Sequence, residues 1–95
     1  MKNISITIIN DTNTLTFDEL CRATNAENSL ILQLIDYHII QPIGNSQTNW
    51  QFDHISLRRA RIASNFYYDL EVNLAGIGLL IDLLEQMDDM KKNQR

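Results

Sequence analysis

Apolar and polar residues alternate near the start of the chain, and further on apolar residues recur at helical spacing. Residues 4–8 read Ile-Ser-Ile-Thr-Ile, a strict alternation of β-branched apolar residues that predicts a strand. Residues 10–13, Asn-Asp-Thr-Asn, are typical of a turn. A lone strand needs a partner, and the short segment 50–52, Trp-Gln-Phe, is the expected one. The pattern therefore predicts a small antiparallel sheet along one side of a group of helices.

The first helix is predicted to begin at Thr16. Thr16 and Glu19 have the spacing of a capping box, in which each side chain accepts a hydrogen bond from a free backbone amide. Asn25 follows where the chain must turn, and asparagine tolerates the left-handed backbone conformation. The apolar face of this helix consists of Phe17, Leu20 and Cys21, with Ala23 as a further candidate.

A second helix is predicted over residues 26–37. His38 follows where the chain leaves this helix with a positive φ, which histidine tolerates better than most residues other than glycine. Pro42 cannot continue a helix. The inward face consists of Ile31, Leu34 and Ile35, with Leu30 at its edge. The outward face consists of Ser29, Leu32, Gln33 and Asp36.

Two longer helices are predicted over residues 54–70 and 74–90, with Asp53 and Asn73 as their N-caps. The expected core stripe of the third helix is Ile55, Ile62, Ala63, Phe66 and Leu70. The fourth helix carries two apolar stripes, Ile77, Leu80, Ile81, Leu84 and Met87 in one, and Leu79, Leu83 and Met90 in the other. A small domain can cover one stripe, so the second suggests a homodimer or another partner. The alternative is that the sheet and the third helix bury both.

These elements predict one domain over residues 1–95, mainly α-helical with a small antiparallel sheet. Their order is that of a winged helix-turn-helix. We expect the helix-turn-helix over residues 16–38, a wing over 43–52 and the C-terminal helices over 53–91. Ninety-five residues suffice for a single small core.

The charge distribution argues against the DNA binding that such a motif commonly performs. The chain carries eight Lys and Arg residues against twelve Asp and Glu residues, a net charge of −4. No Lys or Arg lies between Ala23 and Leu57, so the helix that would enter the DNA groove has no positive charge. A duplex-binding domain must neutralise several phosphates, and we therefore expect DNA not to be a partner.

One basic cluster, Arg58, Arg59 and Arg61, stands in the third helix. In a DNA-binding winged helix such residues could hold phosphates, which position a protein without specifying a sequence. We expect them instead to form a solvated, ion-paired face, with Asp53 and Asp69 as the nearby carboxylates.

No group of residues predicts catalysis, a cofactor or a metal site. His38 and His54 lack metal-ligand spacings such as C-x-x-C or H-E-x-x-H, and no glycine-rich phosphate loop occurs. The pair Asp88 and Asp89 is expected to be solvated. The single cysteine cannot form an internal disulfide, which suggests a reducing cytoplasm. No membrane span or signal peptide is predicted.

The outward face of the second helix is the sharpest indication of function. It offers Leu32 and Asp36, with Glu27 at the start of the helix. An exposed leucine beside carboxylates repels phosphate but suits a protein surface that is partly apolar and partly basic. The alternative is a neutral exposed helix, with Leu32 as an ordinary surface residue.

Several short motifs occur in an order that resembles the CbpM family of chaperone modulators, a branch of the MerR-like winged helix-turn-helix proteins. The resemblance covers nearly the whole chain, although His38 stands where the family often has glycine. The motifs are Phe17-x-x-x-Cys21, Thr24-Asn25-Ala26, Ile39-Ile40-Gln41-Pro42, Trp50-Gln51-Phe52-Asp53 and Val72-Asn73-Leu74-Ala75-Gly76-Ile77.

The resemblance implies an adaptor rather than a transcription factor. CbpM proteins bind the J-domain of the DnaJ-like co-chaperone CbpA and inhibit it. The J-domain presents a basic helix to its Hsp70 partner DnaK, and an acidic modulator can occlude that helix. On this hypothesis we expect the contact face to consist of Glu19, Glu27, Leu32 and Asp36.

Two other hypotheses use the same fold. One is a MerR-like transcriptional regulator, dimerised through the fourth helix, with its arginine cluster on DNA phosphates. The other is a regulator of the toxin–antitoxin or phage type.

Overall fold

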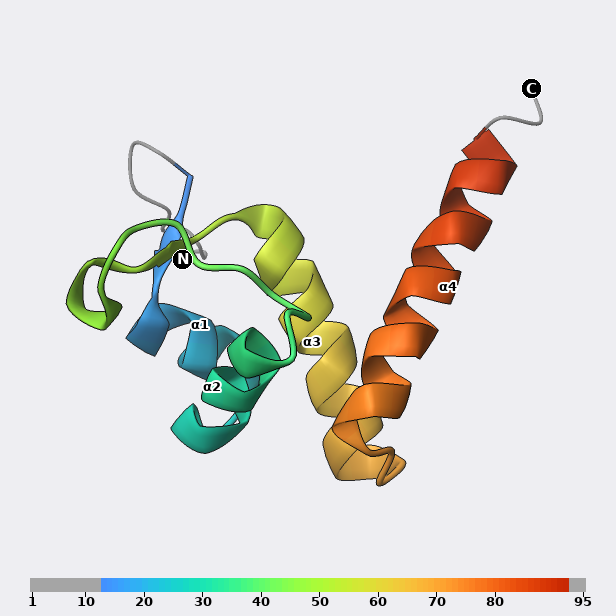
Figure 1. The fold of residues 1–95 in the computed structure, drawn as a ribbon, viewed down its shortest axis with the longest axis horizontal. Coiled ribbons are helices and arrows are strands. Elements are labelled where there is room, and N and C mark those ends of the chain that lie inside the picture. The colour runs from blue at the N-terminus through green and yellow to red at the C-terminus, as the bar shows by residue number, and fades with distance from the viewer. Residues whose placement is uncertain (1–12, 93–95) are drawn as a thin grey trace.

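The computed structural model describes residues 13–92, and a very small sheet lies at one side of its helices (Figure 1). The strand predicted over residues 4–8 lies outside the described residues. Of the turn predicted over residues 10–13, only Asn13 is described. The elements, in chain order, are β1 (Leu15–Thr16), α1 (Phe17–Thr24), α2 (Asn28–Asp36), the short 3-10 helix η1 (Gln47–Asn49), β2 (Gln51–Phe52), α3 (His54–Asp69) and α4 (Leu74–Lys92).

The sheet is antiparallel and centres on β2, which lies within the segment 50–52 predicted to be a strand. Its observed partner is β1, two residues that were not predicted as a strand. Leu15 of β1 lies opposite Phe52, and Thr16 lies opposite Gln51. On the other side of β2, Ile43 and Gln51 exchange backbone hydrogen bonds of 2.8 and 2.9 Å, which closes the wing. Because Thr16 is also the N-cap of α1, this pairing ties the wing directly to the start of the first helix.

The local signals for the helix-turn-helix are confirmed. Thr16 and Glu19 form the reciprocal capping box at the start of α1, and Asn25 ends α1 with φ 55°. His38 has φ 60°, as its place after α2 predicts. The helix α2 is shorter than predicted at both ends, since the backbone of Glu27 is extended and that of Tyr37 leaves the helical region. The two helices are therefore joined by a three-residue turn, residues 25–27.

The core lies where α1, α2 and β2 meet α3, and α4 packs against the far side of α3 (Figure 1). Cys21 is buried, as predicted, and burial raises the pKa of its thiol. The largest fully buried side chains are Phe52, Leu20, Leu30, Ile31, Leu34, Ile77 and Ile81.

The predicted core stripe of α3 is wrong at its two ends. Ile55 and Leu70 are 55% and 65% exposed, whereas Ala60 and Ala63 are fully buried. The buried positions are small because α3 packs against helices on two sides, and small side chains let the helix backbones approach closely. Ser64 is buried there too, and its hydroxyl donates to the carbonyl of Ala60 at 2.8 Å.

The helix α4 is covered only along its first half. Leu74, Ile77 and Ile81 are buried, so the first predicted stripe packs against α3 at its beginning. The interpretation that the domain buries both stripes is wrong, because the exposed large residues of α4 include members of each: Leu79, Leu83, Leu84, Met87 and Met90. Among the described residues, no helix is both long and apolar enough to cross a membrane.

Candidate protein-interaction surfaces

Arg59 on α3 holds the helix-turn-helix and α4 together. Its guanidinium donates to the backbone carbonyl of Ile39 at 2.6 Å, to Asp82 at 2.7 Å and to both oxygens of Glu85 at 2.9 and 3.1 Å. The side chain is only 19% exposed. Burial acts to lower the pKa of Arg59, but the hydrogen bonds and charges of Glu85 and Asp82 outweigh it and raise that pKa. The guanidinium of Arg59 is therefore already bound by groups of its own chain.

The two other arginines of the cluster differ from Arg59. Arg58 forms an exposed ion pair with Asp88 at 2.7 Å, and the hydrogen bond from Arg58 lowers the pKa of Asp88. Arg61 is exposed and makes no hydrogen bond or ion pair within residues 13–92. An ion-paired face is thus confirmed for two of the three arginines.

The partners predicted for the arginines are wrong. All of the paired carboxylates come from α4, whereas Asp53 caps α3 by accepting a hydrogen bond from the amide of Ser56 at 2.9 Å. The sequence separations of 23 to 30 residues in these ion pairs explain the error, because spacing along one helix cannot show which side of the next helix faces it. Arg59 would have to release its partners before it could bind a DNA phosphate.

The outward side of α2 carries one acidic residue, Asp36, and no basic one. Leu32 and Asp36 are separated by four residues and so share a side of the helix. Asp36 is exposed and is the last residue of the helix, but Leu32 is partly buried rather than exposed as expected. Glu27 is the exposed N-cap residue and its side chain makes no capping hydrogen bond. Two free carboxylates therefore flank α2.

Glu19 lies apart from the other three predicted contact residues. It belongs to α1, is partly buried, and its Oε1 atom accepts a hydrogen bond from the amide of Thr16 at 2.8 Å. One of its oxygens thus has a structural role.

Tyr68 is a residue that sequence reasoning missed. Its hydroxyl oxygen accepts a hydrogen bond from the amide of Glu27 at 3.0 Å, so a side chain of α3 satisfies the backbone amide of the N-cap residue of α2. The two residues are 41 positions apart, and no local motif marks such a contact.

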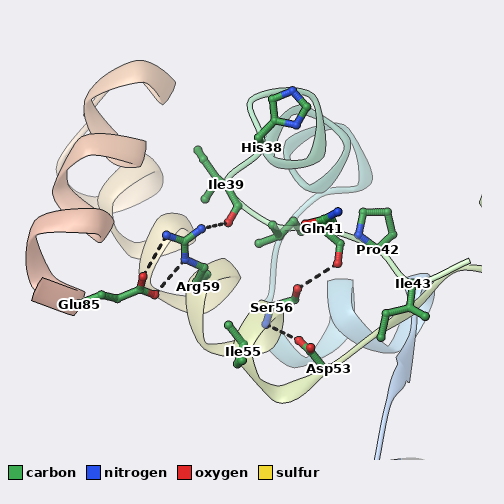
Figure 2. Close-up of a pocket in the computed structure, with 11 residues that line it drawn as sticks. His38, Ile39, Gln41, Pro42, Ile43, Asp53, Ile55, Ser56, Arg59 and Glu85 are labelled. Atoms are coloured by element: carbon green, nitrogen blue, oxygen red, sulfur yellow. Dashed lines mark hydrogen bonds and ion pairs between the residues drawn. The ribbon is translucent and has the colours of Figure 1, made fainter. Parts of the chain in front are cut away.

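A cavity of about 380 Å³ opens beside the loop that joins α2 to the wing (Figure 2). The chain between His38 and Ile43 forms one wall, the first residues of α3 form another, and Glu85 closes the end at α4. Within residues 13–92, no three or more His, Cys, Asp or Glu side chains are placed to hold a metal ion.

The fold and these surfaces define a helix-turn-helix protein of the MerR class, and residues 15–95 match the family model described as "MerR HTH family regulatory protein". A chaperone modulatory protein CbpM of Coxiella burnetii is 38% identical over 88 residues, which cover 93% of this chain and 83% of that protein. Proteins of the same name from Pseudomonas putida and Pseudomonas entomophila are 24% and 22% identical, each over 76% of this chain and 71% of their own. The chain belongs to the CbpM family.

Proposed function

We propose that this protein is a non-catalytic, cytoplasmic chaperone modulator that binds the J-domain of a CbpA- or DnaJ-like co-chaperone. In doing so it would cover the basic helix that the J-domain offers to DnaK and so inhibit the co-chaperone. The observation that supports this best is the charge of α2, which has free carboxylates at both ends and no Lys or Arg. The curated relatives carry the name of chaperone modulators, which agrees with this proposal.

The proposed contact face consists of Glu27, Leu32 and Asp36, with Glu19 at its margin. Carboxylates on the rim of such a face attract a basic partner and raise the rate of association. Leu32 would lose its remaining exposure in the complex and add apolar contact at the centre. Glu19 would act through its charge, since one of its oxygens stays in the capping box.

The test is a calorimetric titration of the isolated J-domain of the CbpA-like co-chaperone into the parent protein and into the Glu27→Lys, Asp36→Lys double variant. We expect near-stoichiometric binding by the parent and binding about tenfold weaker by the variant, a change of about 1.4 kcal/mol. The salt dependence of binding should also decrease, because fewer charges face the partner.

A matched control is Glu71→Lys, which reverses an exposed carboxylate between α3 and α4 and should leave J-domain binding unchanged. Parent-like affinity in the double variant would show that the contact face is elsewhere. A duplex DNA titration in the same buffer tests the alternative regulator hypothesis. Absence of J-domain binding together with salt-sensitive DNA binding would replace the proposed function with a MerR-like regulator.

We also propose that α4 mediates a homodimer. Leu79, Leu83, Met87 and Met90 recur at intervals of three or four residues and are 45% to 62% exposed, so one long apolar stripe faces outward. Sedimentation equilibrium should show a dimer for the parent protein and a monomer for Leu83→Ser, whose side chain lies in the middle of the stripe. A parent protein that sediments as a monomer would refute the dimer and leave J-domain binding untouched.

A further inference from the structure

The cavity beside the α2–wing loop combines a buried apolar floor with an exposed apolar rim. Ile39 and Ile40 are buried beneath it, whereas Ile43 and Ile55 on its rim are 51% and 55% exposed. These two isoleucines come from the wing and from the start of α3, on either side of Asp53 (Figure 2). Exposed apolar residues that gather around a hollow beside charged and polar residues are typical of protein-contact sites.

The charges around this cavity favour a cation. Arg59, the one Lys or Arg side chain in its lining, directs its guanidinium to Ile39 and Glu85 rather than into the open space (Figure 2). Glu85 offsets the charge of Arg59. Asp53 accepts one hydrogen bond at Oδ1 from Ser56, and its Oδ2 has no partner within residues 13–92. The lining is left with one carboxylate that no cation neutralises.

We propose that this cavity accepts a lysine or arginine side chain of the protein partner. The aliphatic stem would lie against Ile43 and Ile55, and the cationic end would sit beside Asp53, as long basic side chains do when they cover apolar surface. This inference rests on the proposed function, because it assumes a partner with a basic helix. It adds a second contact, formed by the wing and α3, to the α2 face.

Two substitutions in the cavity test the charge contribution and the apolar contribution separately. Asp53→Ser removes the carboxylate but keeps a residue that caps helices well, so α3 should still form. Ile55→Ser removes the apolar contact at a position that is more than half exposed. Leu70→Ser is the matched control, because Leu70 is an apolar residue of similar exposure at the other end of α3.

Each variant is titrated with the isolated J-domain at low and at moderate salt. Asp53→Ser should weaken binding about two- to fivefold and reduce its salt dependence, as expected for an ion pair at an interface. Ile55→Ser should weaken binding about three- to tenfold with the salt dependence of the parent. Leu70→Ser should bind like the parent. Circular dichroism confirms that all three variants are folded.

A double-mutant cycle then identifies the occupant. The Lys and Arg residues of the basic helix of the J-domain are neutralised one at a time, and one of them should lose its effect when Asp53 is already serine. Coupling to none of them would overturn the inference. So would parent-like affinity of both cavity variants while the Glu27 and Asp36 reversal still weakens binding, and this result would leave the proposed function standing.

The remaining outcomes point to other occupants. A loss of affinity in Ile55→Ser alone would indicate an apolar side chain and overturn the inference. A change in sedimentation with unchanged J-domain affinity would indicate that a second copy of this chain fills the cavity. Absence of J-domain binding by the parent protein would refute the proposed function itself, and this inference with it.

Discussion

The acidic residues of α2 and those of α4 have opposite roles. On α4, Asp82, Glu85 and Asp88 all pair with arginines of α3, and Arg59 is largely buried between two of them. On α2, Glu27 and Asp36 are exposed and pair with no basic side chain of the described chain. These three carboxylates of α4 link it to α3, whereas Glu27 and Asp36 remain available to a partner.

Glu27 and Asp36 both occupy positions that are unfavourable for the stability of α2. Asp36 ends α2, where the helix dipole is negative and a carboxylate is unfavourable. Glu27 occupies an N-cap position where Ser, Thr, Asp or Asn would serve better, and its side chain makes no capping hydrogen bond. Residues that oppose local stability in this way are often retained for function. The arginines between α3 and α4 show no such conflict.

The largest effect on stability is expected from removing the ion pairs of Arg59. Arg59→Ala should lower the free energy of unfolding by about 2–3 kcal/mol, because it leaves a backbone carbonyl and two carboxylates without their cation. Denaturant unfolding measures this change. Arg61→Ala, on the same helix but without a partner in residues 13–92, should change stability by less than about 0.5 kcal/mol. Equal effects of the two substitutions would contradict the structural role assigned to Arg59.

A smaller effect of opposite sign is expected at Asp36. Asp36→Asn should raise the free energy of unfolding by about 0.3–1 kcal/mol, since it removes a negative charge from the negative end of α2. The same variant should weaken J-domain binding in calorimetry. Asp69→Asn makes the matched change at the last residue of α3 and should give a similar gain in stability. A loss of stability in Asp36→Asn would mean that the carboxylate has a structural partner after all.

The smallest effect concerns the exposed pair of Arg58 and Asp88 and appears as a dependence on pH. Because the pKa of Asp88 is lower in the folded chain than its ordinary value of 3.8, the pair stabilises the fold above that pH. The contribution is lost as the pH falls below about 3.8 and Asp88 takes up a proton. The melting temperatures of the parent and of Arg58→Ala should therefore differ slightly at neutral pH and converge in acid. A constant difference across this range would show that Asp88 does not titrate with the pair.

Much of the helix-turn-helix follows from neighbouring residues alone. The capping box of Thr16 and Glu19, the left-handed turn at Asn25 and the positive φ of His38 each depend on a side chain and its own local backbone. The capping of α3 by Asp53 is likewise a local interaction. The family resemblance, carried by short motifs in order, is confirmed by the comparison with CbpM proteins.

Apart from the ends of α2, the errors concern contacts between elements. The sequence alone marked Ile55 and Leu70 as core residues because they fit a helical stripe, but they extend beyond the region where α3 is covered on both sides. It paired the arginine cluster with nearby carboxylates, whereas α4 brings the actual partners from further along the chain. Periodicity shows which residues share a face, but it does not show which neighbouring element covers that face or how far the cover extends.

The amino-acid sequence by itself determined where the helix-turn-helix begins and turns, and that α2 has no positive charge. These properties are local, since each depends on a few consecutive residues. Only the tertiary structure decided which charges are paired within the fold, which side chain binds the amide of Glu27 and where the cavity beside the α2–wing loop opens. Those outcomes depend on the packing of α3 between two groups of helices, which brings together residues that are far apart in the chain.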